Sequence, residues 1–391
     1  MVRNIIQGYT MNEQTVLISG AGVAGPTLAY WLARAGYRPT VVERARGLRS
    51  SGSPVDVRGP AAHVAAEMGI TAKLREASTD VTALKFVDDA GRRTGRVATS
   101  VLGSSDDVEL SRTDLAAILY EAAADRAEFV FHDSITELRQ DDGGVDVTFE
   151  RGAPRRFDLV IGSDGLHSGV RRLAFGPEHA FVEHMGVYIA TTPLAEPPAD
   201  RTEMVMYNSP GRAVAVHPSR GHAIAAFMFR GAEEPGFDYR NTARHKEMLT
   251  EAYAGAGWRV PELLAQARAA DDLYFDSVSR VRMDSWASGR IVLAGDAASC
   301  VSLFGDGSTL AMAGGYTLAN ELARTPEDPA AAFRRYEAAH RKLVEPKQRN
   351  VSTAAAMLIP ATRRGLAARN LGTRLLPLVS AARRLVPARA A

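Results

Sequence analysis

The hydrophobic pattern near the start of the chain predicts a strand, a tight turn and a helix. Thr15–Ser19 is a short apolar run, rich in β-branched residues, that leads into glycines, and residues 26–34 follow with helix-forming side chains. Residues 39–43 are typical of a second strand. Two parallel strands joined by a helix form a βαβ unit, whose crossover is almost always right-handed. The amino-terminal region therefore predicts an α/β domain.

Further along the chain, segments with mixed helix and strand patterns alternate with a segment that is rich in strand patterns. We expect a helix at residues 114–127, entered through Ser111 or Thr113, and strands at 129–133, 145–150 and 157–161. Between about residues 178 and 275 the chain is β-rich and broken by proline and glycine, with strands expected at 186–192, 203–207, 213–217 and 222–230. A buried strand at 289–294 and helices at 308–323 and 329–344 follow, and helical patterns continue to the end of the chain.

This order of helices and strands predicts a discontinuous α/β domain whose first unit is Rossmann-like. It also predicts an inserted β-sheet domain and a C-terminal helical segment. The expected segments are residues 12–80, 106–177 and 276–328 for the α/β domain, 81–105 and 178–275 for the sheet domain, and 329–391 for the C-terminal helices.

A glycine pattern for binding a dinucleotide lies between the first strand and the first helix. Gly20 and Gly25 bracket a G-x-G-x-x-G segment that also holds Gly22 and Ala24. In such a turn the first glycine permits the tight bend, the second lets a pyrophosphate approach the backbone, and the third lets the helix pack on the strand. Glu43, at the end of the second strand, is placed to accept hydrogen bonds from ribose hydroxyls. Similar turns occur without a ligand, so the interpretation depends on strand, helix, second strand and acid occurring in register.

Two later segments place an aspartate at the end of a strand. Asp164 lies in a glycine turn after residues 158–162, and Asp296 follows Gly295 after residues 289–294. Each aspartate is suited to accept hydrogen bonds from ligand hydroxyls, although each also fits an ordinary turn. After Asp296, a second turn holds Gly305, Gly307 and Ser308 before a helix. Its backbone N–H groups and the helix dipole could stabilise a ligand edge that carries negative charge, such as the N1–C2=O edge of a reduced flavin, although an ordinary strand, turn and helix would look the same.

The order and spacing of these three segments resemble group A flavoprotein monooxygenases of the para-hydroxybenzoate hydroxylase type, including polyketide hydroxylases and tetracycline-modifying monooxygenases. The likeness covers roughly residues 14 to 325. It implies a bound FAD and adds two contacts, from Arg112 near the ribityl and pyrophosphate and from Arg44 near the adenosine. The chain departs from the family at residues 299–303, where rigid prolines are usual, and at Asp306, whose carboxylate would disfavour an anionic flavin unless it points away.

The resemblance also implies a reaction. No second G-x-G-x-x-G follows a strand, so NADPH or NADH is expected to dock transiently. The reduced flavin would react with O₂ to a C4a-hydroperoxide, which would hydroxylate an aromatic or enolic polycyclic small molecule. Two alternatives keep the same motifs: a flavin-containing protein that sequesters its ligand, and a non-oxygenating flavin reductase. We identify no catalytic side chain and expect no metal site.

The substrate is expected between the flavin and the second domain's sheet. Polarisable and aromatic side chains on the expected strands suit a polycyclic face. The candidates are Met206, Phe227, Phe229 and His217. Because alternate residues of a strand face opposite sides, about half of such a set is expected to be plain core.

Composition changes this interpretation little. The formal net charge of +2 gives no reason to expect nucleic-acid binding, and a single cysteine fits a reducing cytoplasm. We expect a monomer or homodimer that uses a small aromatic substrate and O₂. The basic tail after Pro346 holds no acidic residue. Because prolines divide it, we expect helices packed across both domains rather than a helix lying on a membrane.

Overall fold

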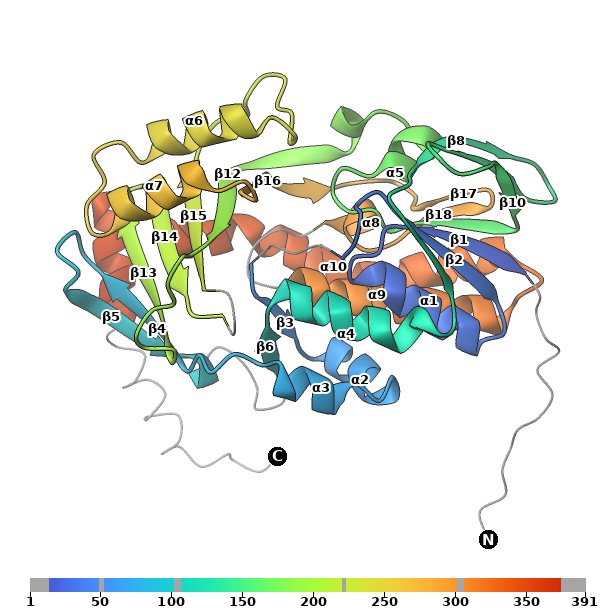
Figure 1. Ribbon diagram of the computed structural model, residues 1–391, viewed down its shortest axis with the longest axis horizontal. Helices are drawn as coiled ribbons and strands as arrows, with labels where there is room; N and C mark the ends of the chain where they lie inside the picture. The colour runs from blue at the N-terminus through green and yellow to red at the C-terminus, as the bar shows by residue number, and fades with distance from the viewer. Residues whose placement is uncertain (1–13, 49–52, 102–106, 220–222, 301–305, 374–391) are drawn as a thin grey trace, which may run out of the picture.

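The computed structural model describes residues 14–48, 53–101, 107–219, 223–300 and 306–373. A six-stranded sheet lies at one end of the molecule and a seven-stranded sheet at the other, as Figure 1 shows. A two-stranded ribbon, β3 (Val55–Val57) and β6 (Val108–Leu110), lies between them. The chain contributes strands to each sheet from several separate segments, so each domain is discontinuous in sequence.

The six-stranded sheet follows the order β17-β18-β11-β1-β2-β7. Its strands are β1 (Thr15–Ser19), β2 (Arg38–Glu43), β7 (Glu128–Phe131), β11 (Leu159–Gly162), β17 (Ala287–Ser288) and β18 (Ile291–Leu293). All neighbours pair in parallel except β17 with β18. The central strands are nearly uniformly apolar because both faces of the sheet are covered.

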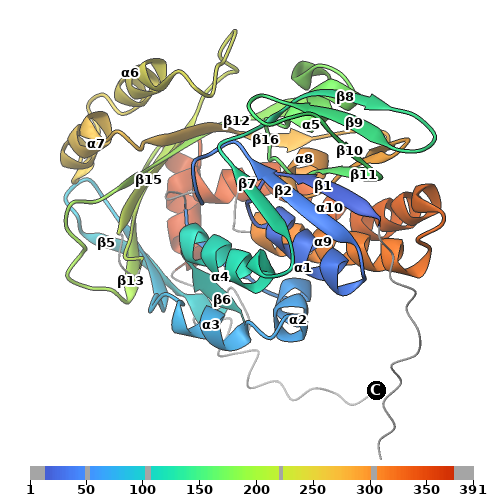
Figure 2. The same ribbon diagram turned by 45° about the vertical axis from the view of Figure 1, so that its right-hand side comes forward.

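Helices cover one face of this sheet and a small antiparallel sheet covers the other (Figure 2). The helices of this domain are α1 (Ala24–Arg34), α2 (Pro60–Glu67), α3 (Thr71–Glu76), α4 (Arg112–Ala124), α5 (Gly169–Ala174), α8 (Asp296–Ser299) and α9 (Asp306–Arg324). The small sheet holds β8 (Ile135–Gln140), β9 (Val145–Phe149) and β10 (Arg155–Phe157). Short 3₁₀ helices lie at η1 (Thr99–Val101) and η2 (Glu178–Ala180).

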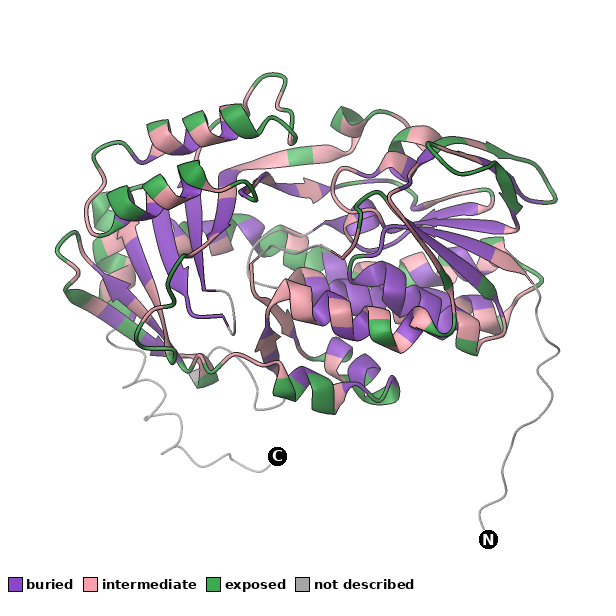
Figure 3. Ribbon diagram, viewed as in Figure 1, coloured by how far each residue is buried: buried purple, intermediate pink, exposed green. Residues whose placement is uncertain are grey.

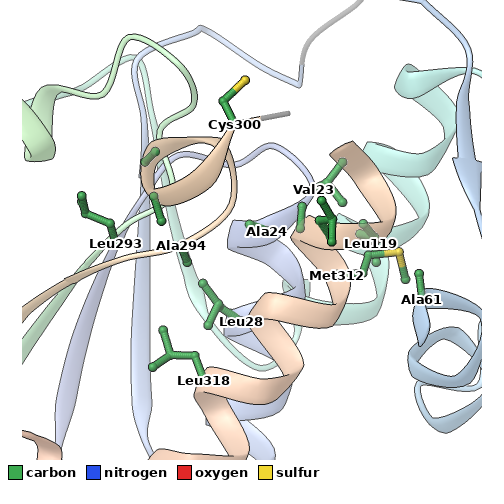
Figure 4. Close-up of a cluster of buried hydrophobic side chains, with 14 of the residues drawn as sticks. Val23, Ala24, Leu28, Ala61, Leu119, Leu293, Ala294, Cys300, Met312 and Leu318 are labelled. Atoms are coloured by element: carbon green, nitrogen blue, oxygen red, sulfur yellow. The ribbon is translucent and has the colours of Figure 1, made fainter. Parts of the chain in front are cut away.

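Small residues let α1 and α9 pack closely. Ala24 and Leu28 of α1 face Met312 and Leu318 of α9 in the core shown in Figure 4. A Cβ added at Gly315 of α9 would lie 3.3 Å from the Leu28 side chain, so the glycine permits this approach. This contact fixes the amino-terminal ends of both helices relative to the sheet, and those ends line the cavity described below.

The seven-stranded sheet follows the order β16-β12-β15-β14-β13-β4-β5. Its strands are β4 (Ala83–Val87), β5 (Arg93–Ala98), β12 (Val182–Pro193), β13 (Glu203–Ser209), β14 (Arg212–His217), β15 (Ile224–Arg230) and β16 (Tyr274–Val281). Helices α6 (Thr242–Ala252) and α7 (Val260–Ala269) cover its outer face, and Figure 3 shows the sheet buried beneath them.

Three expectations about the secondary structure and the domain boundaries were wrong in detail. Helices α6 and α7 fall in the region for which only strands were expected. The expected boundary at residues 275/276 cuts β16, which pairs with β12 on both sides of that boundary. The single strand expected at residues 157–161 is two strands, β10 and β11, that belong to different sheets.

The C-terminal segment connects the two domains. Helix α10 (Pro329–Leu358) packs along α9 and continues through Pro346. The chain then crosses the seven-stranded sheet, where the Ile359 carbonyl accepts a hydrogen bond from Arg230 Nε (2.8 Å) and the Pro360 carbonyl accepts one from the Gly211 N–H (2.9 Å). Residues 363–373 are helical, and the Arg369 guanidinium lies 3.8 Å from the Phe86 ring centroid. The described part of the basic tail thus packs on protein.

Candidate active site

One large cavity runs from the end of β1 to the inner face of the seven-stranded sheet. Its volume is about 2410 Å³, and both domains and the β3–β6 ribbon line it. Pockets for one small ligand usually measure about 300–1,000 Å³. The cavity therefore has room for a dinucleotide and a second ligand together.

The turn after β1 needs glycine at two positions for the fold itself. Gly20 has φ of +102°, and a Cβ on it would lie 2.6 Å from the carbonyl oxygen of Ser163. A Cβ on Gly25 would overlap the carbonyl oxygen of Gly20. At Gly22, in contrast, no heavy atom of the described residues, apart from its chain neighbours, lies within 4 Å of the Cβ position, and this glycine borders the cavity. Within the described part of the chain, no side chain caps the amino terminus of α1, so its first N–H groups are available to an anion.

Glu43 and Arg44 lie at the same end of the cavity. The Glu43 carboxylate accepts hydrogen bonds from the N–H groups of Ala21 and Ala45, both at 2.9 Å. These bonds hold the carboxylate beside the glycine turn. Arg44 donates a hydrogen bond to the hydroxyl of Tyr239 (2.9 Å), a residue that precedes α6. The two residues that are expected to contact the adenosine are therefore adjacent. Tyr239, which belongs to the second domain, contacts one of them, Arg44.

Asp164 and Arg112 line the middle of the cavity. Asp164 accepts hydrogen bonds from the Ser168 hydroxyl and the Val170 N–H, and so also caps α5. Arg112 begins α4, whose N-cap is Ser111. Arg171 was missed by sequence reasoning: its fully buried guanidinium donates to the Ala297 carbonyl (3.0 Å) and ties the Asp164 segment to the Asp296 segment.

Asp296, Gly295 and Gly307 line the cavity beside the amino terminus of α9. Gly295 has φ of +57°, and a Cβ there would lie 3.1 Å from the Cβ of Ala24. Ala24 itself begins α1 and also lines the cavity. The strand end that carries Asp296 is thus fitted closely against the glycine turn. Gly305 lies outside the described residues.

Ser308 and Asp306 are engaged in contacts between elements. The Ser308 hydroxyl donates a hydrogen bond to the Asp56 carbonyl of β3 (2.6 Å), so its side chain joins α9 to the ribbon. The Asp306 carboxylate lies 3.0 Å from Lys347 Nζ and 3.6 Å from Arg58 Nε. Two cations therefore offset the negative charge that the sequence places beside the expected flavin edge.

The inner face of the seven-stranded sheet forms an apolar wall of the cavity. Its lining residues from β12 to β15 are Ile189, Met204, Met206, Ala215, His217, Ile224, Ala226 and Met228. Among these described residues His217 is the one titratable side chain. Phe227 and Phe229 point to the opposite face, where both rings pack on Tyr253 at centroid distances of 5.3 and 6.1 Å. The expectation that these two phenylalanines contact substrate is corrected by the alternation of β15.

Two groups of titratable residues at the cavity were not expected from the sequence. Asp56 and Glu109 lie on the β3–β6 ribbon. His167 contacts Glu178 Oε1 (2.9 Å) and Asp276 Oδ1 (3.2 Å), and its ring stacks on Tyr239 at 3.9 Å. Burial alone would lower the pKa of His167, but these two carboxylates outweigh it and raise the pKa to about 9. The sequence signal for both groups was weak because their members are far apart along the chain.

Comparison with known proteins identifies the family. The FAD binding domain family model matches residues 13–346. An uncharacterized protein of Mycobacterium tuberculosis is 42% identical over 346 residues, covering 87% of this chain and 93% of its own. A flavin-dependent monooxygenase of Legionella longbeachae is 35% identical over 339 residues, covering 85% and 87%.

A solved structure gives the same answer. The crystal structure of the tetracycline destructase Tet(51) superposes with a TM-score of 0.81 at 31% identity, covering 92% of this chain and 95% of that one. The chain therefore belongs to the FAD binding domain family and is an FAD-dependent monooxygenase of the group A flavoprotein type.

Proposed function

We propose that the enzyme hydroxylates a planar, polycyclic small molecule that carries an aromatic or enolic hydroxyl, with NADPH or NADH as the reductant. One observation carries the proposal: a single cavity joins a dinucleotide-type glycine turn to a flat apolar wall that holds one imidazole. The similarity to a flavin-dependent monooxygenase and to a tetracycline destructase supports this choice of substrate class.

The residues at the first end of the cavity fit FAD. Open space at Gly22 would admit the pyrophosphate, and Glu43 and Arg44 would bind the adenosine. Arg112, Asp164 and Asp296 would face the ribityl chain and the flavin ring. Gly295 and Gly307 would let the flavin approach the backbone closely, while Gly20, Ala24, Gly25 and Ser308 would support the site through packing. When bound, FAD supplies hydride acceptance and activation of O₂.

The apolar wall determines which substrate fits. Ala215 and Ala226 lie on neighbouring strands and are adjacent in register, so they leave a flat area between Met206 and Met228. Flat aromatic or enolic ring systems match such a surface, and thioethers make favourable contacts with aromatic rings. The protein's role at this wall is to hold the ring system against the flavin and to exclude water.

The reductant is proposed to bind transiently. The described residues contain one βαβ unit with the dinucleotide-type glycine turn, and we assign that unit to FAD. A nicotinamide cofactor would then enter the open cavity, transfer hydride and leave. We further propose a reducing cytoplasm as the compartment, because the sequence has a single cysteine, Cys300, which cannot form an internal disulfide. Among the described helices, none is both long and apolar enough to span a membrane.

The test is NADPH and NADH oxidation by the FAD-loaded enzyme, alone and with a panel of phenols, hydroxyanthraquinones and tetracyclines. We expect slow oxidation alone, faster oxidation with a matching polycycle, and a product one oxygen heavier. Met206→Trp should block the wall and abolish the stimulation without loss of FAD. Phe229→Leu is the matched control on the other face. If no phenolic or enolic compound changes the rate, a sequestering protein or a non-oxygenating reductase is favoured instead.

A further inference from the structure

The acidic residue at the start of α9 is paired with cations from two other elements. The Asp306 carboxylate lies 3.0 Å from Lys347 Nζ of α10 and 3.6 Å from Nε of Arg58, which follows β3. Only 15% of the Asp306 side chain is exposed, so solvent screens its charge incompletely. The next two residues, Gly307 and Ser308, line the cavity. The charge balance of Asp306 is therefore set at the end of the cavity where we place the flavin.

Arg58 is shared between two carboxylates. Its guanidinium also lies 2.5 Å from the Asp56 carboxylate, and hydroxyls at the start of α9 donate hydrogen bonds to the Asp56 carbonyl, which hold this end of β3 on α9. Burial raises the pKa of Asp56 to about 6, Arg58 lowers it, and Asp306 is among the carboxylates that raise it further. Once Asp56 is ionised, the two carboxylates and Arg58 leave one negative charge. Lys347 supplies the matching positive charge.

Helix α10 presents Lys347 to α9 from its packed face. Val344, Lys347 and Val351 are spaced by three and four positions, which places them on one side of the helix, and both valines are buried. The neighbouring Gln348 side chain donates a hydrogen bond to the carbonyl of Cys300 (3.2 Å), a residue that lines the cavity. The packing of α10 thus holds the ammonium group beside a residue that is remote from it in sequence.

A charge beside the flavin acts on its reduction. Uptake of two electrons and one proton leaves a negative charge on the N1–C2=O edge of the ring. An unbalanced carboxylate nearby would therefore favour the oxidised flavin, and an unbalanced cation would favour the reduced one. Because 47% of the Lys347 side chain is exposed, solvent weakens its effect. We expect loss of its charge to change the relative affinity for reduced and oxidised FAD by about threefold to tenfold. That range corresponds to about 15–30 mV for a two-electron couple.

We propose that Lys347 is a redox-tuning residue, which raises the reduction potential of the bound FAD by neutralising Asp306. Arg58 assists it but is divided between Asp306 and Asp56. The role is electrostatic, and Lys347 acts on the flavin through the charge at the start of α9. The inference rests on the proposed placement of the flavin beside α9. It goes beyond the proposed function, because it concerns neither the substrate nor the nicotinamide reductant.

The test is the midpoint potential of the FAD-loaded enzyme, measured by reducing the flavin together with a reference dye by xanthine and xanthine oxidase. Lys347→Met should lower the potential, and Asp306→Asn should raise it. The double variant lacks both charges, so its potential should return close to that of the wild type. A structural disturbance would instead move both single variants in the same direction and would add up in the double variant.

A second cation of α10 provides the matched control. Arg349 lies two positions after Lys347, so it points to another side of the helix, and its nearest carboxylate is Glu345 of the same helix (3.9 Å). Arg349→Met should leave the potential unchanged, and Lys347→Arg should keep the wild-type value. The shift in Lys347→Met should shrink at high salt, because the lysine is half exposed. Flavin absorbance after gel filtration checks that each variant is loaded, and Lys347→Gln replaces Lys347→Met if that variant loses FAD.

The proposal and the proposed function can fail independently, since the potentials are measured without substrate and without NADPH or NADH. Equal potentials in the wild type, Lys347→Met and Asp306→Asn would overturn the proposal, and so would shifts of both variants in one direction. If the potentials shift as expected and no phenolic or enolic compound stimulates NADPH or NADH oxidation, the tuning stands and the proposed function is wrong. If a substrate is hydroxylated while the potentials stay equal, the function stands and the tuning is wrong.

Discussion

At the scale of single residues, the glycine turn after β1 divides into two positions that the fold needs and one position that borders the cavity. Gly25 is fixed by the carbonyl oxygen of Gly20, whereas Gly22 borders open cavity. All three glycines were predicted together from one motif. The structure distinguishes them because each contact depends on how α1 sits on the sheet, which sequence spacing alone does not describe.

This difference gives a prediction for two matched variants. Gly22→Val should leave the thermal stability of the apoprotein near that of the wild type and weaken FAD binding by about 10²-fold, because the side chain enters only the pyrophosphate space. Gly25→Ala should destabilise the fold by about 1–3 kcal/mol or more, because its Cβ overlaps backbone. Melting temperature and flavin absorbance after gel filtration measure both effects. Full FAD occupancy in Gly22→Val would refute the site.

Contacts between residues that are far apart in the chain could not be predicted from the sequence. Asp56 and Glu109 belong to three-residue strands far apart in the chain, and their pairing depends on the ribbon between the domains. Phe229 and Met206 look equally suitable as substrate contacts in sequence. Phe229 cannot contact substrate because its side chain packs in the core between the sheet and helices α6 and α7. Those helices were themselves not predicted.

At the scale of elements, His167 links the Asp164 loop to the second domain. It lies between Glu178 and Asp276, and Asp276 belongs to β16 of the seven-stranded sheet. Tyr239, which precedes α6, stacks on the same ring and contacts Arg44. A cationic His167 thus holds two domains together beside the expected adenosine site.

The pH dependence of this link has a defined sign. The pKa of His167 is raised from 6.5 to about 9 in the folded protein, so its stabilising contribution is full below pH 6.5 and is lost as pH rises through about 9. The difference in melting temperature between the wild type and His167→Gln should therefore be largest at pH 6 and small above pH 9. The exposed His179→Gln should show no such trend. A constant difference across this range would show that His167 acts by packing alone.

Elements with a strong periodic pattern were predicted well, and those set by tertiary context were not. Strand β1 and helix α4 match expectation closely because their apolar patterns and the Ser111 cap are local signals. Strand β16 was divided by the expected domain boundary, because membership of a sheet depends on its partner β12. Helix α10 runs past Pro346, where a local rule predicts an end; packing on α9 supports it.

At the scale of the whole molecule, α10 and the following helix join the domain of the six-stranded sheet to the seven-stranded sheet. Leu358 lines the cavity, and its carbonyl accepts a hydrogen bond from Asn208 (2.9 Å). Arg369 donates to the same asparagine (2.8 Å) and covers Phe86, and burial lowers the pKa of Arg369 to about 10. The segment therefore supports the sheet from the side opposite α6 and α7.

Deletion of residues 361–391 should weaken substrate-stimulated NADPH oxidation while FAD stays bound. The deletion uncovers Phe86 and removes the hydrogen bond from Arg369 to Asn208, both on the sheet, and leaves the expected cofactor end of the cavity untouched. Flavin absorbance and the stimulated rate are the two measurements, with Arg369→Ala as the single-residue counterpart. Loss of liposome binding with unchanged catalysis would instead assign the tail to a membrane surface.

The central claim is that one cavity holds FAD and a hydroxylated polycycle in positions that allow oxygen transfer. Incubation of the FAD-loaded enzyme with NADPH, a stimulating substrate and isotopically labelled O₂, followed by mass spectrometry of the product, tests this claim most directly. The account predicts a gain of one labelled oxygen atom per product molecule. NADPH consumption that yields only hydrogen peroxide, or a product that carries no label, would contradict it.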